Sequence, residues 1–329
     1  MVERTVVLGH VVLDDVYAYD ADAAPSTLGG AGAYAALGQA LVLEDTAVVS
    51  GVGEDLGQGP LDLFSAAGVN TDGLVVLDPK TPRTRIEYFE DGEREETSVH
   101  GDAHFSRLDP RWHQVPKDYR DAEGIYVFDG LNPELWGDLA QVRANTGAQI
   151  LWEIRSDICE PQNLQAITDQ LRIVDILSIN RTEATSLVGT TELQVALDEL
   201  RGLVPVVVLR VGADGAYAAN QETALHAKSS NHFPVVDPTG AGNAFSGAFL
   251  ARWVQRAGST AKSRAISGSP ESSESQMDAA LRAGTAAAAF TIAQRGAPDV
   301  NQKSRKKFNQ VFKTVEVNEV ASEPEKDGE

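Results

Sequence analysis

The chain has 329 residues, of which 42% are hydrophobic and 23% charged, and its net charge at pH 7 is −20. This length and composition predict a soluble globular protein with one large α/β domain, alone or with a small addition. The acidic charge argues against nucleic acid and against an anionic membrane as partners, because both attract basic surfaces.

Three features bear on the cellular compartment. Cys159 is the only cysteine, so the sequence predicts neither a disulfide framework nor a cysteine-based metal site. Residues 1–4 lead directly into an apolar run, which we interpret as a buried strand rather than a signal peptide. No segment approaches the length of a membrane-spanning helix. We therefore expect a reducing, cytoplasmic location.

The first predicted strand is followed by carboxylates. Residues 5–12 are apolar and rich in β-branched side chains, which favours a buried strand, and Asp14 and Asp15 come just after them. Open α/β sheets bind ligands beyond the carboxyl ends of their strands. Asp14 is therefore a candidate ligand-binding residue, and a solvated strand end is the alternative.

A glycine-rich loop then leads into an alanine-rich helix. The string G-x-G-x-x-A runs from Gly30 to Ala35 and is typical of dinucleotide-binding turns. Such a turn should follow a strand directly, whereas residues 19–27 are polar and loop-like. A dinucleotide-binding fold is thus the weaker alternative for this segment.

Residues 83–99 predict a β-hairpin. Apolar and polar side chains alternate on both sides of Asp91-Gly92, and this dipeptide favours a two-residue turn. Arg83 and Arg85 on the hairpin could contact an anionic substrate, or could simply keep an edge strand charged and soluble.

The middle of the chain predicts a parallel sheet. Residues 47–53, 124–128 and 149–154 are expected strands, and a helix is expected at residues 133–145 between the last two. This order is a βαβ alternation, which is typical of parallel sheets. One more strand is expected at residues 205–211, before a turn that contains two glycines.

Another predicted strand ends at Asn180, and Glu183 lies in the first turn of the helix that follows. Mg²⁺ prefers a carboxylate together with water molecules, so Glu183 could serve a metal. An ordinary helix cap with an acidic first turn is the alternative.

The stretch from Val235 to Phe245 carries the clearest chemical signal. An apolar run, a short glycine-rich turn and an alanine-rich segment predict a strand, a loop and a helix. Gly240 and Gly242 leave room for a ligand close to the backbone. A helix that starts near Asn243 would direct unpaired N–H groups into the turn, which could then bind a phosphoryl group. A tight turn that needs glycine only for its shape is the alternative.

The segment from Asp237 to Asn243, Asp-Pro-Thr-Gly-Ala-Gly-Asn, resembles the C-terminal signature of the PfkB/ribokinase family of small-molecule kinases. Further family motifs occur in the family's order, so the resemblance spans roughly residues 6–298. It implies a ribokinase-like α/β fold, with a mostly parallel sheet, helices on both faces and a small β-lid. The form Gly-Ala-Gly-Asn is similar to that of the fungal maintenance-of-killer-like branch.

The resemblance also implies roles for individual residues. The amides of Gly240, Ala241 and Gly242 would form the anion hole, and Asn243 stands where the family has its Asp base. Substrate binding is implied for Asp14, Gly29, Gly30 and Tyr34. Nucleotide binding is implied for Asn180, Glu183, Arg210, Gly212, Gly215 and Gly296. Glu183 would hold Mg²⁺ through water, and Asp237 and Thr239 would lie beside a K⁺ ion.

The expected domain covers residues 1–312, with lid elements at about residues 83–99. Residues 258–277 are rich in Ser, Gly, Lys and Glu and predict a disordered insertion. Residues 313–329 predict a disordered acidic tail. The resemblance implies that two copies could associate as a homodimer through their lids.

Two functions remain open. The first is ATP- and Mg²⁺-dependent phosphoryl transfer to a hydroxyl of a small sugar-like molecule, slow because an amide at position 243 cannot accept a proton near pH 7. The second is a catalytically impaired pseudokinase that binds a nucleotide or metabolite and serves as a scaffold or assembly factor. A nucleotide and a small-molecule substrate are the expected partners.

Overall fold

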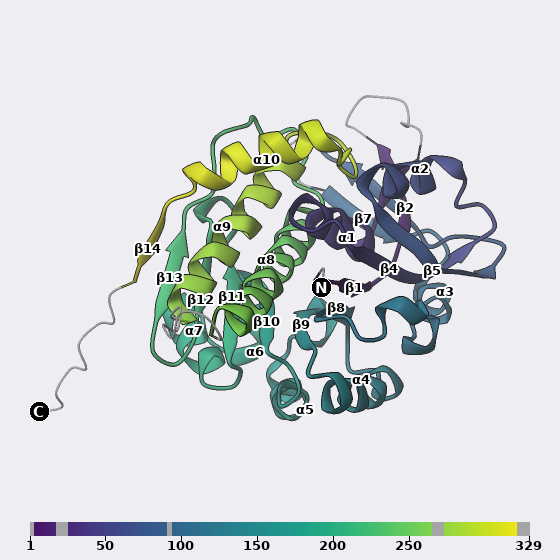
Figure 1. Ribbon diagram of the computed structural model, residues 1–329. Helices are drawn as coiled ribbons and strands as arrows, with labels where there is room; N and C mark the ends of the chain where they lie inside the picture. Colours follow the sequence, from purple (N-terminus) through teal and green to yellow (C-terminus); the bar gives the residue numbers. More distant parts are fainter. Residues whose placement is uncertain (1–2, 18–25, 91–93, 265–272, 321–329) are drawn as a thin grey trace, which may run out of the picture.

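The computed structural model describes residues 3–17, 26–90, 94–264 and 273–320 (Figure 1). Its main sheet has ten strands in the order β14-β13-β12-β11-β10-β9-β8-β1-β4-β5. In chain order they are β1 (Thr5–Leu8), β4 (Thr46–Gly53), β5 (Val69–Asp78), β8 (Gly124–Asp129), β9 (Gln149–Ile154), β10 (Ile176–Asn180), β11 (Val206–Arg210), β12 (Ala216–Ala219), β13 (Ala224–Ala227) and β14 (Val317–Glu319).

Parallel pairing joins the strands from β5 to β11, and antiparallel pairing joins those from β11 to β14. The helices are α1 (Ala31–Val42), α2 (Gln58–Ala67), α3 (Asp102–Arg107), α4 (Pro133–Thr146), α5 (Leu164–Leu171), α6 (Arg181–Val188), α7 (Leu193–Arg201), α8 (Ala241–Arg264), α9 (Ser273–Thr291) and α10 (Gln302–Thr314). Among the described residues, no helix is both long and apolar enough to cross a bilayer.

The core lies in two layers, one on each face of the main sheet. Val7 and Tyr126 face a cluster that contains residues of α1, α8, α9 and α10. Val6 and Ile125, their neighbours in sequence, face a second cluster with residues of α4 to α7. Because successive side chains of a strand point to opposite faces, strands buried on both faces must be apolar throughout. The predicted α/β fold, with helices on both faces of a mostly parallel sheet, is confirmed (Figure 1).

A second sheet has the order β3-β2-β6-β7. Its strands are β2 (Val12–Tyr17), β3 (Thr27–Gly29), β6 (Arg83–Tyr88) and β7 (Arg94–Ser98). β6 and β7 pair antiparallel, so the two strands of the expected hairpin are confirmed. Its turn at residues 91–93 lies outside the described residues.

The expected first strand, residues 5–12, is wrong as a single element. β1 ends at Leu8, and β2 of the small sheet begins at Val12. Between them the chain passes the start of α1 so closely that a Cβ on Gly9 would lie 3.0 Å from Cα of Gly32. Asp14 therefore lies within a strand of the small sheet, not beyond the end of a main-sheet strand.

The C-terminal region is more ordered than the sequence predicts. α10 continues to Thr314, Val315 is buried in the core, and β14 pairs with β13. Apolar side chains at residues 311, 315 and 317 explain why this acidic stretch packs onto the domain. Residues 321–329 of the expected tail lie outside the described residues.

Helices extend into both ends of the expected insertion at residues 258–277. α8 reaches Arg264 and α9 begins at Ser273, while residues 265–272 lie outside the described residues. Disorder of this insertion stays a prediction.

Removal of residues 316–329 should destabilise the domain, because it deletes β14 and leaves the edge of β13 unpaired. We expect the Tm to fall by at least about 2 °C in calorimetry, which corresponds to a loss of roughly 1 kcal/mol or more. Removal of residues 321–329 alone is the matched control and should leave Tm unchanged. Equal Tm values for both truncations would show that β14 contributes no stability.

Candidate functional site

The predicted phosphate-binding turn lies at the start of α8. Gly240 has a φ of +74°, and Ala241 is the first residue of the helix. A Cβ at position 240 would lie 2.2 Å from Cγ of Tyr34, so both the backbone and the space require glycine. Because the first N–H groups of a helix lack intrahelical acceptors, the positive end of α8 faces this turn. A phosphoryl oxygen fits such a position.

The strand expected just before this turn is wrong. Val235 and Val236 lie in an irregular segment and are 67% and 50% exposed. The amides of Val236 and Asp237 donate to the carbonyl of Ile292, which directly follows α9, at 2.7 and 3.2 Å. The segment is irregular because these amides are bound by one carbonyl rather than by a neighbouring strand.

A buried carboxylate, Glu153, organises the residues beside the turn. It lies on β9, is 2% exposed and is the central acceptor of a network. Arg210 Nη1 lies 2.7 Å from its Oε1, Asn243 Nδ2 donates to the same oxygen at 3.0 Å, and the Tyr126 hydroxyl donates to Oε2 at 2.8 Å. Burial, and then the neighbouring Glu153, raise the pKa of Tyr126 well above its usual range, so the phenol remains a donor.

Glu153 was missed as a site residue in the sequence. The available signal is a single ionisable side chain in the otherwise apolar segment 149–154. A charge in a strand that is buried on both faces must have partners, but their identity depends on the tertiary fold.

Arg210 brings the turn and the predicted metal-binding helix together. A Cβ on Gly242 would lie 1.9 Å from Arg210 Nη1, so the guanidinium rests directly on the turn. Arg210 Nη2 lies 3.9 Å from Glu183 Oε2. The residues implied for the anion hole and for Mg²⁺ therefore border one side chain.

Asn180 and Glu183 form a reciprocal capping box at the start of α6. Asn180 Oδ1 accepts from the Glu183 amide at 2.9 Å, and Glu183 Oε2 accepts from the Asn180 amide at 2.8 Å. Burial raises the pKa of the Glu183 carboxyl, and Arg210 opposes this shift. The cap that the sequence left as an alternative is thus present, and it orients the carboxylate that a metal would need.

The residues implied for substrate binding also come together. Asp14 is 5% exposed, and a Cβ on Gly29 would lie 1.8 Å from its Oδ2. Gly30, with a φ of +87°, immediately precedes α1. The glycines therefore allow the Asp14 carboxylate to approach the backbone at the start of this helix.

Close contact between α1 and α8 connects this substrate side with the phosphate turn. A Cβ on Gly38 would lie 2.3 Å from the Ala244 carbonyl oxygen, and one on Gly247 would lie 2.2 Å from that of Ala35. Tyr34 on α1 is buried, and its ring covers Gly240. The two parts of the site are thus held by backbone-to-backbone packing.

The three glycines implied for nucleotide binding do not all lie in the same part of the structure. Gly212, with a φ of +63°, opens the turn after β11, and Gly215 lies where a Cβ would be 1.9 Å from the Ala227 carbonyl oxygen. Gly296 instead lies against Thr27 of β3, with 3.2 Å between a Cβ and the Thr27 Cβ. It borders a cavity of about 490 Å³ that Leu28 and Arg83 also line, so it lies beside the small sheet.

A second polar cluster, unnoticed in the sequence, lies at the carboxyl ends of β1 and β8. His10 Nε2 lies 3.1 Å from Asp109 Oδ1, and Asp129 ends β8. Burial raises the pKa of Asp129, and Asp109 adds to this shift. Arg155, just after β9, opposes it and forms an ion pair with Asp157 at 2.7 Å.

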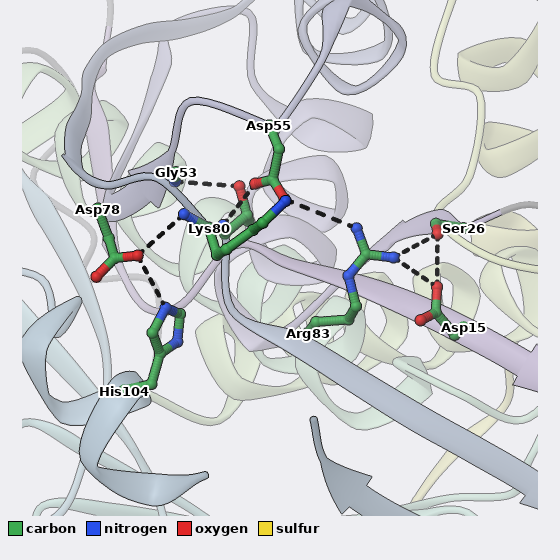
Figure 2. A network of polar contacts seen from close by, with 9 residues as sticks. Asp15, Ser26, Gly53, Asp55, Asp78, Lys80, Arg83 and His104 are labelled. Carbon is green, nitrogen blue, oxygen red and sulfur yellow. Dashed lines mark hydrogen bonds and ion pairs between the residues drawn. The ribbon is translucent and has the colours of Figure 1, made fainter. Parts of the chain in front are cut away.

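Arg83 connects the small sheet with the main sheet (Figure 2). Its Nη1 lies 2.9 Å from Asp15 Oδ1 and donates to Ser26 Oγ at 2.8 Å, while its Nη2 lies 4.0 Å from Asp55 Oδ2. Burial raises the pKa of Asp55, but hydrogen bonds from Thr81 and then Lys80 outweigh it, so the pKa lies below its usual range. Arg83 is thus engaged in structural ion pairs.

Arg85 is likewise paired within the small sheet. Its Nη2 lies 2.5 Å from Glu87 Oε1, and its guanidinium lies 4.3 Å from the centroid of the Tyr17 ring. Both arginines lie on β6, which is placed between β2 and β7, so the expectation that they protect an edge strand is wrong. They form ion pairs with Asp15 and Glu87 of the small sheet instead.

The chain resembles a known protein family and several known proteins. The pfkB family of carbohydrate kinases matches residues 3–304. A cytidine kinase from Thermococcus kodakarensis is 26% identical over 257 residues, which cover 75% of this chain and 87% of that protein. Protein MAK32 from Saccharomyces cerevisiae is 26% identical over 146 residues, 37% of this chain and 40% of that protein.

Two solved structures show the same fold. An adenosine kinase from Sinorhizobium meliloti has a TM-score of 0.74 at 20% identity, and the match covers 94% of this chain and 99% of that one. A putative ribokinase II from E. coli, in complex with ATP and Mg²⁺, has a TM-score of 0.70 at 20% identity, with coverage of 94% and 99%.

Gly240→Ala should destabilise the fold, because the new Cβ would meet the Tyr34 ring and the backbone would be strained. We expect chemical denaturation to show a loss of about 1–3 kcal/mol. Gly137→Ala, in α4, where a Cβ meets nothing within 4 Å, is the matched control and should be neutral or stabilising. A stable Gly240→Ala protein would refute the required contact.

Proposed function

Because the chain belongs to the pfkB family of carbohydrate kinases, we propose that it transfers the γ-phosphoryl group of ATP to a hydroxyl of a small sugar-like molecule in the presence of Mg²⁺. The observation that supports this most is the position of Arg210. Its guanidinium lies against the turn at Gly242 and is paired with the Glu183 carboxylate. A phosphoryl group bound at the turn would have hydrogen-bond donors, a cation and a carboxylate for Mg²⁺ around it.

The residues present fit a metal carried mainly by nucleotide and water. Mg²⁺ in such sites keeps several waters and takes one or two carboxylates together with phosphate oxygens. Glu183 can supply the carboxylate, and the described residues contain no group of three or more metal-ligating side chains. Mg²⁺ bound there would neutralise charge on the phosphates.

A K⁺ ion beside Asp237 and Thr239 is part of the same proposal. Asp237 is 7% exposed, and its Oδ1 accepts from the Thr239 amide at 2.9 Å. This arrangement supports a rigid, oxygen-rich loop directly before the anion-binding turn, where a monovalent cation would stabilise the turn.

Asn243 should make the reaction slow. Its amide cannot take a proton from the acceptor hydroxyl, and general acid–base catalysis contributes about 10²–10⁴-fold. Phosphoryl transfer passes through a loose transition state and depends mainly on positioning, so turnover does not need a base at this position. Water would accept the proton. Nucleosides belong among the acceptors to test, since relatives include a cytidine kinase and an adenosine kinase.

A second function, that of a nucleotide- or metabolite-binding scaffold, is favoured by one contact. The side chain at the base position is hydrogen bonded to Glu153, so it already has a structural partner. In either case we place the protein in the cytoplasm. A second copy would associate through the small sheet, where β7 is an edge strand.

Release of ADP from MgATP should be measured with a panel of nucleosides, ribose and other sugars. We expect the natural chain to turn over at least one acceptor slowly. Asn243→Asp alone would place a second carboxylate about 3.0 Å from Glu153 Oε1. Two carboxylates this close repel, which would raise the pKa of the new Asp and weaken it as a base. Glu153→Gln is therefore combined with Asn243→Asp.

We expect the combined variant to be up to about 10²-fold faster than the natural chain. Turnover only in variants that carry the Asn243→Asp substitution would favour the scaffold function. Failure of every variant to bind ATP would contradict the kinase function and a nucleotide-binding scaffold alike.

Glu183 predicts a pH dependence. Its raised pKa means that Glu183 becomes protonated at a higher pH than an ordinary Glu does. As the pH falls, Mg²⁺-dependent ATP affinity should therefore decline more steeply in the natural chain than in Glu183→Gln. Calorimetric titration at several pH values measures the difference. Identical pH profiles would exclude Glu183 as the metal-supporting carboxylate.

The stability of the fold should depend on pH in the opposite direction. Because the pKa of Glu183 is higher in the folded than in the unfolded state, folding disfavours its ionised form. The contribution of Glu183 to the free energy of unfolding is therefore smallest at pH values above its folded-state pKa. Glu183→Gln, which keeps an oxygen for the Asn180 amide, should therefore raise Tm near neutral pH. The gain should vanish as the pH falls below the Glu183 pKa.

A further inference from the structure

The resemblance implies nucleotide binding for Arg210 but does not say which part of the nucleotide its side chain would contact. It extends from the carboxyl end of β11 to the first turn of α8, and its side chain is 14% exposed. Its Nη1 lies where a side chain at Gly242 would begin, 1.9 Å from the Cβ position. The guanidinium therefore lies at the place where the turn would present a bound phosphoryl group.

The hydrogen-bonding capacity of Arg210 is only partly used. A guanidinium carries five N–H donors. Nη1 lies 2.7 Å from Glu153 Oε1, whereas Nη2 lies 3.9 Å from Glu183 Oε2, beyond hydrogen-bond distance. Nε is buried and finds no hydrogen-bond partner among the described residues. A buried donor without an acceptor is costly, and phosphate oxygens would satisfy several such donors at once.

Glu153 explains how the cation is kept at the turn. Its carboxylate is fixed by donors from three elements: Tyr126 of β8, Asn243 of α8 and Arg210 itself. Because this carboxylate is buried, Arg210 cannot leave it without a large electrostatic cost. The guanidinium is thus pre-positioned: Nη1 lies against both Glu153 and the turn, and Nη2 lies on the side of Glu183.

We propose that Arg210 is a direct ligand of the terminal phosphoryl group, held in place by Glu153, and that it makes the site prefer a nucleoside triphosphate to a diphosphate. The proposal rests on the proposed nucleotide-binding function and deepens it. A fixed guanidinium between the turn and the metal-supporting carboxylate stabilises the three charged oxygens of a γ-phosphoryl group and has little to contact on a diphosphate.

Calorimetry with the full chain tests this, with a non-hydrolysable ATP analogue and ADP as ligands, each with Mg²⁺. Arg210→Gln should weaken binding of the triphosphate about 10- to 100-fold and change ADP binding less than about 3-fold. Glu153→Gln, which removes the counter-ion that holds the guanidinium at the turn, should also weaken triphosphate binding, but less than Arg210→Gln does.

Two further variants separate ligand binding from folding. Arg143→Gln removes the partly buried ion pair with Asp175 at the amino end of β10, at the opposite end of the strand from Asn180, and should change neither affinity. Glu153→Gln combined with Arg210→Gln leaves no unpaired buried carboxylate, and it should still show the selective loss of triphosphate binding.

The outcomes are distinguishable. Equal losses for both nucleotides, or tighter triphosphate binding in Arg210→Gln, would overturn the role of Arg210 while leaving nucleotide binding intact. A natural chain that binds neither ligand would overturn the proposed function and this inference with it.

Discussion

The buried carboxylate of Glu153 is the constraint on which the site depends. An ionised group inside a sheet that is covered on both faces is tolerated only with a counter-ion and hydrogen-bond donors. Arg210 supplies the charge, and Tyr126 and Asn243 supply the remaining donors. These partners come from three elements, β11, β8 and α8, and Glu153 itself lies on β9, so one charge connects four elements at the carboxyl ends of the strands. The composition of the site follows from this requirement.

The regular part of the fold could be predicted because its signals are local. The buried strands at 46–53, 149–154 and 206–210 are short apolar runs between turn residues. The capping box of Asn180 and Glu183 involves only four consecutive residues, so a local pattern is enough to predict it. Alternation around residues 83–98 likewise identified the strands β6 and β7. The family resemblance then supplied the arrangement of these pieces.

What the sequence did not reveal depends on contacts between distant residues. The partner of Glu153 at position 243 lies 90 residues away, so no local pattern identifies it. The run at residues 5–12 is mostly apolar, and periodicity does not show that the chain leaves the main sheet at Gly9 and enters the small sheet at Val12. Val235 and Val236 have the composition of a strand, but no neighbouring strand pairs with them. The C-terminal strand β14 forms only because β13 offers a free edge.

The glycine contacts between α1 and α8 have a consequence for selectivity. Where two helices touch through backbone atoms at Gly38 and Gly247, there is no layer of side chains that could compress or rearrange. The distance from Asp14 to the turn at Gly240 is therefore fixed by the scaffold. Under the proposed function, an acceptor bound at Asp14 would need the correct length for its hydroxyl to reach the turn, so the size of the molecule would help to decide which compounds react.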